Sequence, residues 1–417
     1  MSVFFIPYIP FMKFTAFNFT DEVNQGLDAM RFEEATPVQE ESIPHIQKGQ
    51  DIIAVAQTGT GKTAAYLLPV LDQIVKGKGG KISCLIIAPT RELAMQIDQQ
   101  IEGFSYFTGA SSIAIYGGGS GSSFEAEKTA LKDGADIIVA TPGRLLSHLN
   151  LKYVQISECE HLILDEADRM LDMGFADDIK RITEFLPKKR QNIMFSATMP
   201  PKIRKLAKEI MHEPAEVNIA ISQTAEGILQ AAHMAHDGQK NELLKFLLKG
   251  KDELSSIIIF TSRKSSVKDI VRDLKKMEMD AEGISSDLDQ DGREEVLRQF
   301  RNKRLRILVA TDIISRGIDI DSIDLVLNYD VPSDPEDYVH RVGRTARAKS
   351  SGVALTFINQ DGVRDFNKIE QLIGKSVPKV PNPPEIGEGP PYKVQEKRGR
   401  GNPRRKPFKS GPKSRRK

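Results

Sequence analysis

The sequence predicts an α/β protein with two tandem doubly wound parallel-sheet domains and a disordered basic C-terminal tail. Its 417 residues suffice for two or three domains, and 40% of them are hydrophobic, so each domain can bury a core. Short runs rich in Ile and Val alternate with longer segments of helical periodicity, as is typical of parallel strands covered by helices. This alternation occurs twice, in two stretches of different sequence, so two domains of similar architecture are expected.

The first stretch predicts six strands, most of them unbroken apolar runs as expected for strands buried on both faces. They are residues 51–56, 84–89, 112–116, 136–140, 161–165 and 192–196, with helical segments such as 63–76 and 91–104 between them. The second stretch predicts strands at 256–261, 281–284, 306–310, 325–328 and 353–358, with helices such as 265–277 and 293–301. The expected domains are therefore residues 13–213 and 228–377.

The segments outside these domains differ in composition. Residues 214–227 contain small polar residues and read as the linker, and residues 1–12 form an N-terminal extension in which Met12 is a candidate translation start. Six prolines between 378 and 391 predict that the fold ends at 377 and that an extended, disordered tail follows. From Lys393 to Lys417, twelve Lys and Arg face one acid, which gives +11, so residues 1–392 carry −9 of the total +2. Such a tail predicts either a disordered arm that binds a polyanion or a solvated extension that only aids solubility.

Several protein classes are excluded by what the sequence lacks. No apolar run approaches the ~18 residues of a membrane-spanning helix, and the apolar N terminus lacks the basic residues of a signal peptide. The two cysteines, Cys84 and Cys159, lie in or beside apolar runs and are expected to be reduced, structural thiols. These features indicate a cytoplasmic protein without a membrane partner.

The stretch AQTGTGKT, residues 56–63, follows a predicted strand and opens a helix. Gly59 and Gly61 allow backbone N–H groups to turn toward phosphate oxygens at the positive end of that helix. Lys62 can reach the β- and γ-phosphates and Thr63 can ligate Mg²⁺. The order of strand, loop, GKT and helix argues against a simple Gly-rich turn, although Ala56 replaces the usual first Gly. The candidate nucleotide-binding residues of the loop are Thr58, Gly59, Thr60, Gly61, Lys62 and Thr63.

The stretch HLILDEADRM, residues 161–170, places three acids at the end of a predicted strand. A phosphate-binding loop needs a second acid at the end of a neighbouring strand, where it holds Mg²⁺, usually through water. Asp165 fits this role, and Glu166 can orient or deprotonate the attacking water. Asp168 is expected to contact another motif, with a helix-stabilising acid as the alternative.

These two motifs together resemble the DEAD-box ATP-dependent RNA helicases, of the bacterial RhlE type, over residues 14 to 374. The resemblance implies two RecA-like domains that flank a cleft. The stretch ATPVQ, residues 35–39, is similar to the family's Q motif. By this resemblance Gln39 reads the adenine edge, Phe32 stacks on its ring and Phe14 is the isolated upstream aromatic. A Gln amide offers both a donor and an acceptor, so it can select adenine over guanine.

Further signatures follow in the family's order. PTREL (89–93), GG (117–118) and TPGR (141–144) resemble RNA-backbone motifs, and each follows a strand, where sheet ligands usually bind. Their side chains and N–H groups suit phosphates and sugars, which position RNA without reading its sequence. Arg91 and Arg144 could alternatively face water. The implied RNA-binding residues are Pro89, Thr90, Arg91, Gly117, Gly118, Thr141, Pro142, Gly143, Arg144 and, in the second domain, Thr311.

The second domain carries ATDIISRGID (310–319) and YVHRVGRTARA (338–348). By the resemblance, Gly317 and Asp319 face the nucleotide, while Arg344 and Arg347 resemble arginine fingers for the γ-phosphate. Ala346, in place of a more common Gly, is a feature of RhlE-type members. The residues implied in coupling the two domains are Asp168, Ser196, Thr198, His340 and Arg341.

The resemblance implies RNA-stimulated hydrolysis of ATP, with Mg²⁺, coupled to local unwinding or remodelling of RNA duplexes and ribonucleoproteins. Two alternatives stay open, an ATP-gated RNA clamp with little unwinding and a DNA translocase with the same core. RNA is the expected partner, held through contacts that do not depend on its sequence. Ribosomal precursors and RNA-decay proteins are further candidates, and a monomer is expected.

Overall fold

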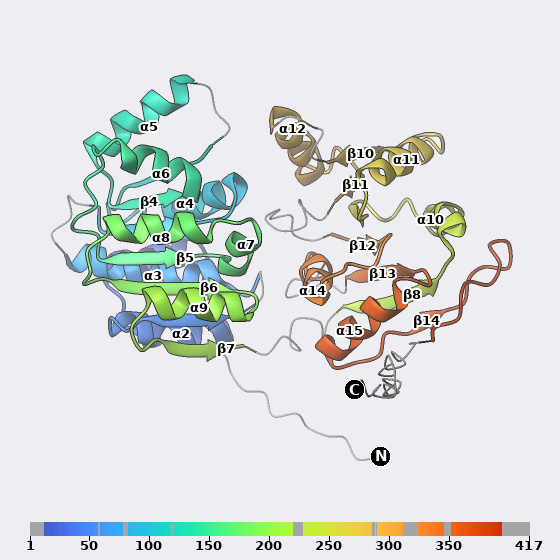
Figure 1. The fold of residues 1–417 in the computed structure, drawn as a ribbon, viewed down its shortest axis with the longest axis horizontal. Helices are drawn as coiled ribbons and strands as arrows, with labels where there is room; N and C mark the ends of the chain where they lie inside the picture. The colour runs from blue at the N-terminus through green and yellow to red at the C-terminus, as the bar shows by residue number, and fades with distance from the viewer. Residues whose placement is uncertain are drawn as a thin grey trace, which may run out of the picture.

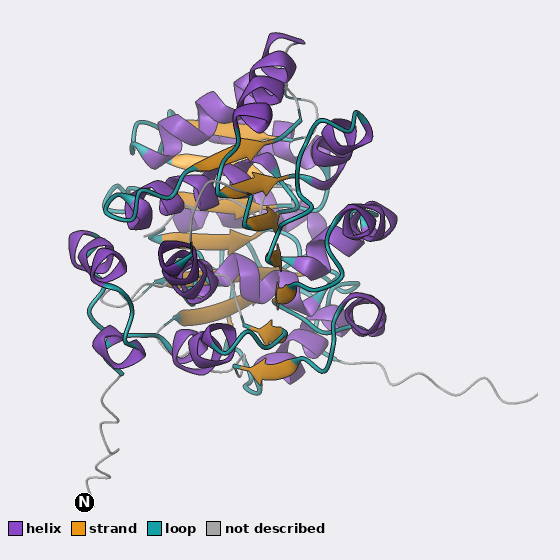
Figure 2. Cartoon of the chain, turned by 90° about the vertical axis from the view of Figure 1, so that its left-hand side faces the viewer, coloured by secondary structure: helices purple, strands orange, loops and turns teal. Residues whose placement is uncertain are grey.

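The computed structural model describes residues 12–56, 59–77, 82–117, 121–219, 228–285, 288, 290–311, 323–345 and 352–393. Within these residues the chain forms two seven-stranded parallel sheets, each covered by helices on both faces (Figures 1 and 2). The strand orders are β3-β4-β2-β5-β6-β1-β7 and β10-β11-β9-β12-β13-β8-β14. The predicted fold class is confirmed. None of the described helices is long and apolar enough to cross a membrane.

The first half holds seven strands and the helices that cover them. The strands are β1 (Ile52–Val55), β2 (Cys84–Ile87), β3 (Ser112–Ile115), β4 (Ile137–Ala140), β5 (His161–Leu164), β6 (Gln191–Ser196) and β7 (Ala215–Asn218). The helices are η1 (Phe14–Phe17), α1 (Asp21–Ala29), α2 (Pro37–Gln47), α3 (Lys62–Lys76), α4 (Arg91–Ser105), α5 (Gly121–Asp133), α6 (Pro142–Asn150), α7 (Ala167–Asp172), α8 (Ala176–Phe185) and α9 (Pro201–Ile210).

The second half repeats this architecture. Its strands are β8 (Leu229–Met234), β9 (Ile257–Phe260), β10 (Ala281–Ile284), β11 (Ile307–Ala310), β12 (Leu325–Asn328), β13 (Val353–Ile358) and β14 (Lys379–Val380). Its described helices are η3 (Asp237–Gln239), α10 (Lys240–Leu248), α11 (Lys264–Lys275), α12 (Gln290–Arg301), α14 (Pro335–Val342) and α15 (Val363–Ile373).

The central strands are buried along their whole length, which explains their unbroken apolar sequences. Successive residues of β1 point to opposite faces, so Ile52 and Ala54 belong to one core and Ile53 to the other. Fully burying one such Ile side chain contributes about 1.5–3 kcal/mol. The two cores hold the strand ends in fixed positions.

Parallel pairing brings three strand ends together at one edge of the first sheet. β6 lies between β1 and β5, and Ile193 pairs with Ile52 on one side and with Ile163 on the other. The Gly-rich loop follows β1, Asp165 follows β5 and Ala197 follows β6. Ligands of doubly wound sheets bind at the carboxyl ends of strands, so the candidate site lies at this edge.

The sequence does not predict β7, β8 or β14, which lie at or next to sheet edges. β7 reads AEVN and has a single buried residue, Val217, because an edge strand needs no continuous apolar run. It pairs with β1 and occupies part of the segment expected to be the linker. Residues 220–227 of that segment lie outside the described residues.

The chain stays packed on the second sheet beyond residue 377, where the prolines suggested that the fold ends. Asn382 Nδ2 donates to the carbonyl of Met234 at 2.8 Å. The hydroxyl of Tyr392 donates to Glu370 at 2.6 Å, and Lys379 Nζ lies 4.1 Å from the centroid of the Tyr392 ring. Residues 378–393 are therefore a strap on the second half. Residues 1–11 and 394–417 lie outside the described residues, so the expectations for them stay predictions.

Candidate nucleotide and RNA site

The Gly-rich loop is held by the segment that starts α2. Thr36 Oγ1 donates to the carbonyl of Thr60 at 2.7 Å, and Gln39 Nε2 donates to the carbonyl of Gly61 at 3.0 Å. Gln39 Oε1 accepts from the N–H of Thr36 at 2.8 Å, which completes a capping box. Two predicted nucleotide-binding motifs are thus joined by two hydrogen bonds. Each group of the Gln39 amide still has one bonding position for a ligand.

Gly61→Ala is expected to weaken ATP binding at least ~10-fold, or ~1.4 kcal/mol. Gly61 has a φ of +90°, and a Cβ there would lie 2.4 Å from Gln39 Nε2, so the substitution displaces the loop and the amide together. Calorimetric titration with ATP measures the loss. Gly49→Ala is the matched control, because Gly49 also has a positive φ (+72°) but has open space around it. Equal affinities for both variants would show that this packing does not matter for binding.

Lys62 begins α3 and carries a buried ammonium group. It is 6% exposed, and within the described part of the chain its Nζ has no hydrogen-bond partner. Its charge favours the ionised forms of Asp165 and Glu166, so it lies near both carboxylates. A buried cation without a hydrogen-bond partner is costly unless a ligand satisfies it. The site therefore fits a nucleotide phosphate.

Asp165 follows β5 and is oriented from two sides. Its Oδ1 accepts from the N–H of Glu166 and its Oδ2 accepts from the hydroxyl of Tyr66, each at 2.9 Å. Burial raises the pKa of Asp165, and the charge of Lys62 partly offsets this effect. No group of three or more His, Cys, Asp or Glu among the described residues could hold a metal ion. The donor set fits a Mg²⁺ ion that is completed by phosphate and water, as Mg²⁺ prefers.

Glu166 stands in the left-handed region, with φ 50° and ψ 51°, directly before α7. Its Oε2 accepts from Nη1 of Arg169 at 3.1 Å, and both side chains are 9% exposed. Burial opposes ionisation of Glu166, but the charges of Arg169, Lys62 and His340 outweigh burial and hold its pKa below the ordinary value. His340 belongs to α14, which faces α7 across the two halves (Figure 1). Glu166 is therefore ionised at neutral pH.

Asp168 contacts Ser196, the last residue of β6, through its backbone. Its N–H donates to Ser196 Oγ at 3.2 Å, while its Oδ1 accepts from the N–H of Arg169 at 3.0 Å. Ser196 and Thr198 are both buried. Asp168 was expected either to contact another motif or to stabilise the start of a helix. Its backbone N–H makes the contact with β6, and its carboxylate accepts from the N–H of Arg169 in the first turn of α7.

The remaining first-half residues predicted to bind RNA follow β2, β3 and β4, which are neighbours in the sheet. Thr90 Oγ1 accepts from the N–H of Leu93 and caps α4, and the Arg91 guanidinium lies 4.8 Å from the centroid of the Tyr116 ring. The structure brings these loops to one edge, where they carry Pro89, Thr90, Arg91, Gly117, Thr141, Pro142, Gly143 and Arg144.

Arg144 is engaged by α5 and does not simply face water. Its Nε donates to Glu127 Oε2 at 2.7 Å, and its guanidinium lies 4.7 Å from the centroid of the Phe124 ring. Glu127 Oε2 also lies 2.8 Å from Nε2 of His148, which stacks on Phe124. If Arg144 binds RNA as predicted, a phosphate would have to displace Glu127 from its guanidinium.

The upstream aromatic residues form a cluster. Phe14 is 3% exposed and packs against Phe17 and Phe32. Phe32 is only partly buried and contacts Phe104 edge-on, with centroids 5.2 Å apart. Phe14 therefore packs behind Phe32, and the nucleotide contact predicted for these aromatic residues stays a prediction.

In the second half, Thr311 and Arg341 are buried residues with different surroundings. Thr311 follows β11, and its Oγ1 has no hydrogen-bond partner among the described residues. Nη1 of Arg341 donates to Asn328 Oδ1 at 2.9 Å and to the carbonyl of Asp330 at 3.2 Å. These two contacts lie within the second half, so a coupling role for Arg341 stays a prediction.

Arg344 follows α14 and is half-buried, and its N–H donates to the carbonyl of Arg341 at 3.2 Å. The preceding helix α14 carries His340, whose charge favours the ionised form of Glu166 from the second half. Other predicted site residues lie outside the described residues, namely Thr58, Gly118, Gly317, Asp319 and Arg347.

Sequence reasoning missed four residues that shape the site. Thr36 was readable as the first residue of a T-x-x-Q capping box, and Arg169 as an i,i+3 partner of Glu166. Tyr66 had no such signal, since its partner Asp165 is 99 positions away. Glu127 likewise reaches Arg144 only through the packing of α5 on α6, 17 positions apart.

Both halves match known helicase families. Residues 36–206 match the DEAD/DEAH box helicase family, and residues 239–349 match the helicase conserved C-terminal domain. The chain is 42% identical over 365 residues to the ATP-dependent RNA helicase CshA of Listeria monocytogenes, covering 87% of this chain and 69% of the relative. It is 40% identical over 362 residues to the ATP-dependent RNA helicase DeaD of Haemophilus influenzae, covering 86% and 58%.

Solved helicase structures share the fold. Dbp5 of S. cerevisiae bound to RNA and ADP BeF3 superimposes with a TM-score of 0.79 at 30% identity, covering 88% of this chain and 95% of that chain. Mss116p bound to ssRNA and AMP-PNP also gives 0.79, at 28% identity, with coverage of 91% and 81%. The two sheets are RecA-like helicase domains, and the chain belongs to the DEAD-box family of ATP-dependent RNA helicases.

Proposed function

We propose that ATP binds at the carboxyl edge of β1, β6 and β5, with Gln39 at the adenine and Lys62 at the β- and γ-phosphates. The observation that carries this proposal is the buried Lys62 ammonium, which has no hydrogen-bond partner in the described chain and lies near two buried carboxylates. Thr63 and Asp165 would hold Mg²⁺, Asp165 through water. A bound Mg²⁺ supplies charge neutralisation for the phosphates.

Glu166 is the proposed base for the attacking water. A general base must be ionised and rigidly aimed, and both conditions are supported by the Arg169 ion pair and by the fixed left-handed backbone before α7. In-line attack on the γ-phosphate develops negative charge on its oxygens, which Lys62 is placed to stabilise.

Completion of the site requires the second half. Arg344 and Arg347 are the proposed arginine fingers, and Ser196, Asp168 and His340 lie along the proposed route between the halves. RNA would bind across the loops after β2, β3, β4 and β11 and favour the closed arrangement. Hydrolysis is then RNA-dependent, because the open state lacks part of the catalytic constellation. Closure on one strand of a short duplex would release the other strand.

Arg169→Gln is expected to shift the acid limb of the pH profile of kcat/KM to higher pH. The substitution removes the first cation that stabilises ionised Glu166, so burial then raises the pKa of this carboxyl. At a pH where Glu166 is fully ionised in the unchanged protein, part of the variant is therefore protonated at Glu166 and inactive. ATPase rates between pH 5 and 8 measure the shift. Arg181→Gln is the control, because Arg181 is exposed on α8. An unshifted acid limb would remove Glu166 from the role of base.

Deleting residues 393–417 is expected to weaken RNA affinity and to flatten its salt dependence. The segment carries a charge of +11, and each phosphate contact on a single strand contributes a slope of about −0.7 in log affinity against log salt. Fluorescence anisotropy with a short labelled RNA at several salt concentrations measures both. A full-length variant with the tail Lys and Arg changed to Gln separates charge from length. Unchanged affinity and slope would show that the tail only aids solubility.

ATPase assays with matched RNA and DNA oligonucleotides test the choice of nucleic acid. RNA should stimulate hydrolysis and DNA should not, since contacts to the 2′-OH distinguish the two polymers. Equal stimulation would favour the DNA translocase. A duplex-release assay beside a measured lifetime on single-stranded RNA separates the helicase from the ATP-gated clamp, which would persist on RNA without releasing strands.

The finer identity of the protein is also a proposal. The RhlE-type subgroup rests on Ala346, whereas the relatives compared above carry the names CshA and DeaD. A cytoplasmic monomer that acts on ribosomal precursors or with RNA-decay proteins is consistent with an RNA helicase of this size. Crosslinking and sequencing of bound RNA from cells identifies the target.

A further inference from the structure

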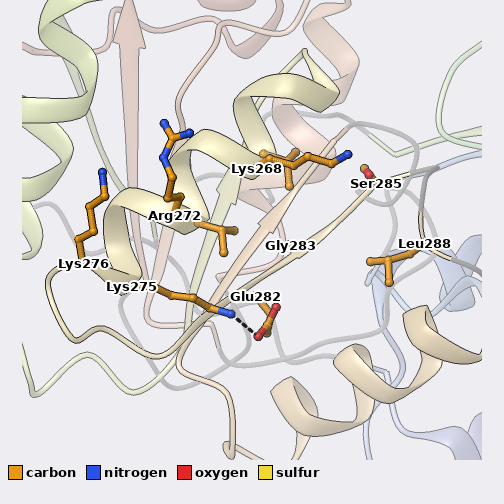
Figure 3. A pocket seen from close by; sticks show the side chains of 10 residues that line it. Lys268, Arg272, Lys275, Lys276, Glu282, Gly283, Ser285 and Leu288 are labelled. Atoms are coloured by element: carbon orange, nitrogen blue, oxygen red, sulfur yellow. Dashed lines mark hydrogen bonds and ion pairs between the residues drawn. The ribbon is translucent and has the colours of Figure 1, made fainter.

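A pocket on the second half is lined by none of the residues assigned above to the nucleotide or to RNA. It has a volume of about 780 Å³ and lies between α11 and β10 (Figure 3). β10 is the terminal strand of its sheet and pairs only with β11 among the described strands. The pocket is therefore open at a sheet edge, within the size range of pockets that bind ligands.

The floor of the pocket is apolar. Val267 and Val271 of α11 lie beside Gly283 of β10, and Leu288 borders the floor. A Cβ at Gly283 would lie 2.6 Å from Cγ1 of Val267. The absence of a side chain at Gly283 therefore lets α11 approach β10 closely. Such a floor gains free energy by covering apolar side chains of a partner.

The rim of the pocket is basic. Four cations line it, Lys268, Arg272, Lys275 and Lys276, against a single lining acid, Glu282. Glu282 is paired with Lys275 at 2.6 Å, and Figure 3 shows this pair on one side of the hollow and Lys268 beside Ser285 on the other.

Two acids outside the pocket also pair with the rim. Asp269 lies 2.9 Å from Arg272, and Asp273 lies 3.6 Å from Arg272 and 3.4 Å from Lys276. These pairs are solvent-exposed at the cations, so they are weak and exchange readily for a partner's carboxylates. The lining itself keeps an excess of positive charge.

We infer that this pocket binds an acidic peptide segment of a partner protein that carries apolar side chains between its carboxylates. The apolar side chains would cover Val267, Val271 and Leu288, and the carboxylates would meet Lys268 and Lys275. RNA fits less well, because its charged phosphate backbone would not cover the apolar floor formed by Val267, Val271 and Leu288. The site is separate from the ATP site, so a partner can dock without displacing the nucleotide.

The test is selection from a random 12-residue peptide library on the full chain, followed by affinity measurements on the enriched peptides. We expect enrichment of Asp and Glu around Leu, Ile or Phe. Val271→Glu and the double variant Lys268→Glu/Lys275→Glu should each weaken binding at least ~10-fold. Lys249→Glu, an exposed position of the same half outside the pocket, should not. RNA-stimulated ATPase activity shows that the variants are folded.

Three outcomes would overturn the inference. The first is enrichment of no peptide, or of peptides without acidic residues. The second is binding that neither pocket variant weakens, which would place the peptide elsewhere. The third is a loss of affinity for a ten-nucleotide RNA in the double variant without any peptide binding, which would assign the rim to the RNA path.

Discussion

Glu166→Gln is expected to abolish ATP turnover, with a fall in kcat of at least ~10²–10⁴-fold, while ATP and RNA still bind. The amide is nearly isosteric with the carboxylate but cannot accept a proton, so the step that activates water is lost. The substitution leaves the proposed ATP-binding groups in place, namely the Gly-rich loop, Lys62 and Asp165, so the affinity for ATP should be retained. Steady-state ATPase rates and calorimetric titration of ATP measure the two effects separately.

The control for this variant is Glu184→Gln, an exposed acid at the end of α8. It changes the net charge equally and should leave turnover unchanged. The buried ion pair of Glu166 with Arg169 makes thermal stability a necessary second measurement, since an uncompensated buried charge destabilises a protein. Loss of ATP binding in a folded Glu166→Gln protein would assign a structural role to Glu166.

Arg344→Ala is expected to lower kcat by about 10³-fold or more, in the range of an arginine finger. The guanidinium would contact the γ-phosphate only in the closed state, so its loss raises the energy of the transition state without weakening the first encounter with ATP. The expected result is a large fall in RNA-stimulated kcat with little change in the affinity for ATP. RNA affinity without nucleotide should be unchanged.

Arg364→Ala supplies the comparison, because Arg364 is exposed on α15 of the same half. Arg344→Lys is informative as well, since Lys keeps the charge but loses the planar fork that matches a phosphate. Comparable rates for Arg344→Ala and Arg364→Ala would remove Arg344 from the catalytic site. Equal losses of ATP affinity and kcat would indicate ground-state binding instead.

The parts of the site that could be predicted from sequence are those built by adjacent residues on one strand end. Lys62 and Thr63 follow a strand and open a helix, and Asp165 and Glu166 end an apolar run. Parallel pairing then brings both strand ends to the same edge. The strands themselves were readable for the same reason, because burial on both faces demands continuous apolar sequence.

Other features depend on helix packing, which local sequence does not specify. Tyr66 on α3 reaches Asp165 at the end of β5, and Glu127 on α5 reaches Arg144 on α6, which lies below α5 in Figure 1. The edge strands β7 and β14 escaped prediction because they carry few apolar residues. The ion pair of Arg144 with Glu127 also changes what we expect of this arginine. An RNA phosphate could bind it only by displacing the Glu127 carboxylate.

The native cysteines make a direct measurement of closure possible. Cys84 and Cys159 are buried, and burial raises the pKa of Cys159 to about 12 and the pKa of Cys84 well above its ordinary value, so neither thiol is reactive. Cysteines introduced at the exposed positions Lys188 and Lys249, one in each half, can therefore be labelled selectively.

The most direct test measures energy transfer between these two labels with a non-hydrolysable ATP analogue, with RNA and with both. It shows whether the two halves approach each other when the catalytic site is completed. We expect a shortened distance only when both ligands are bound, together with ATP hydrolysis only in the presence of RNA. Closure with the analogue alone, or an unchanged distance with both ligands, would contradict a catalytic site that RNA completes by bringing the two halves together.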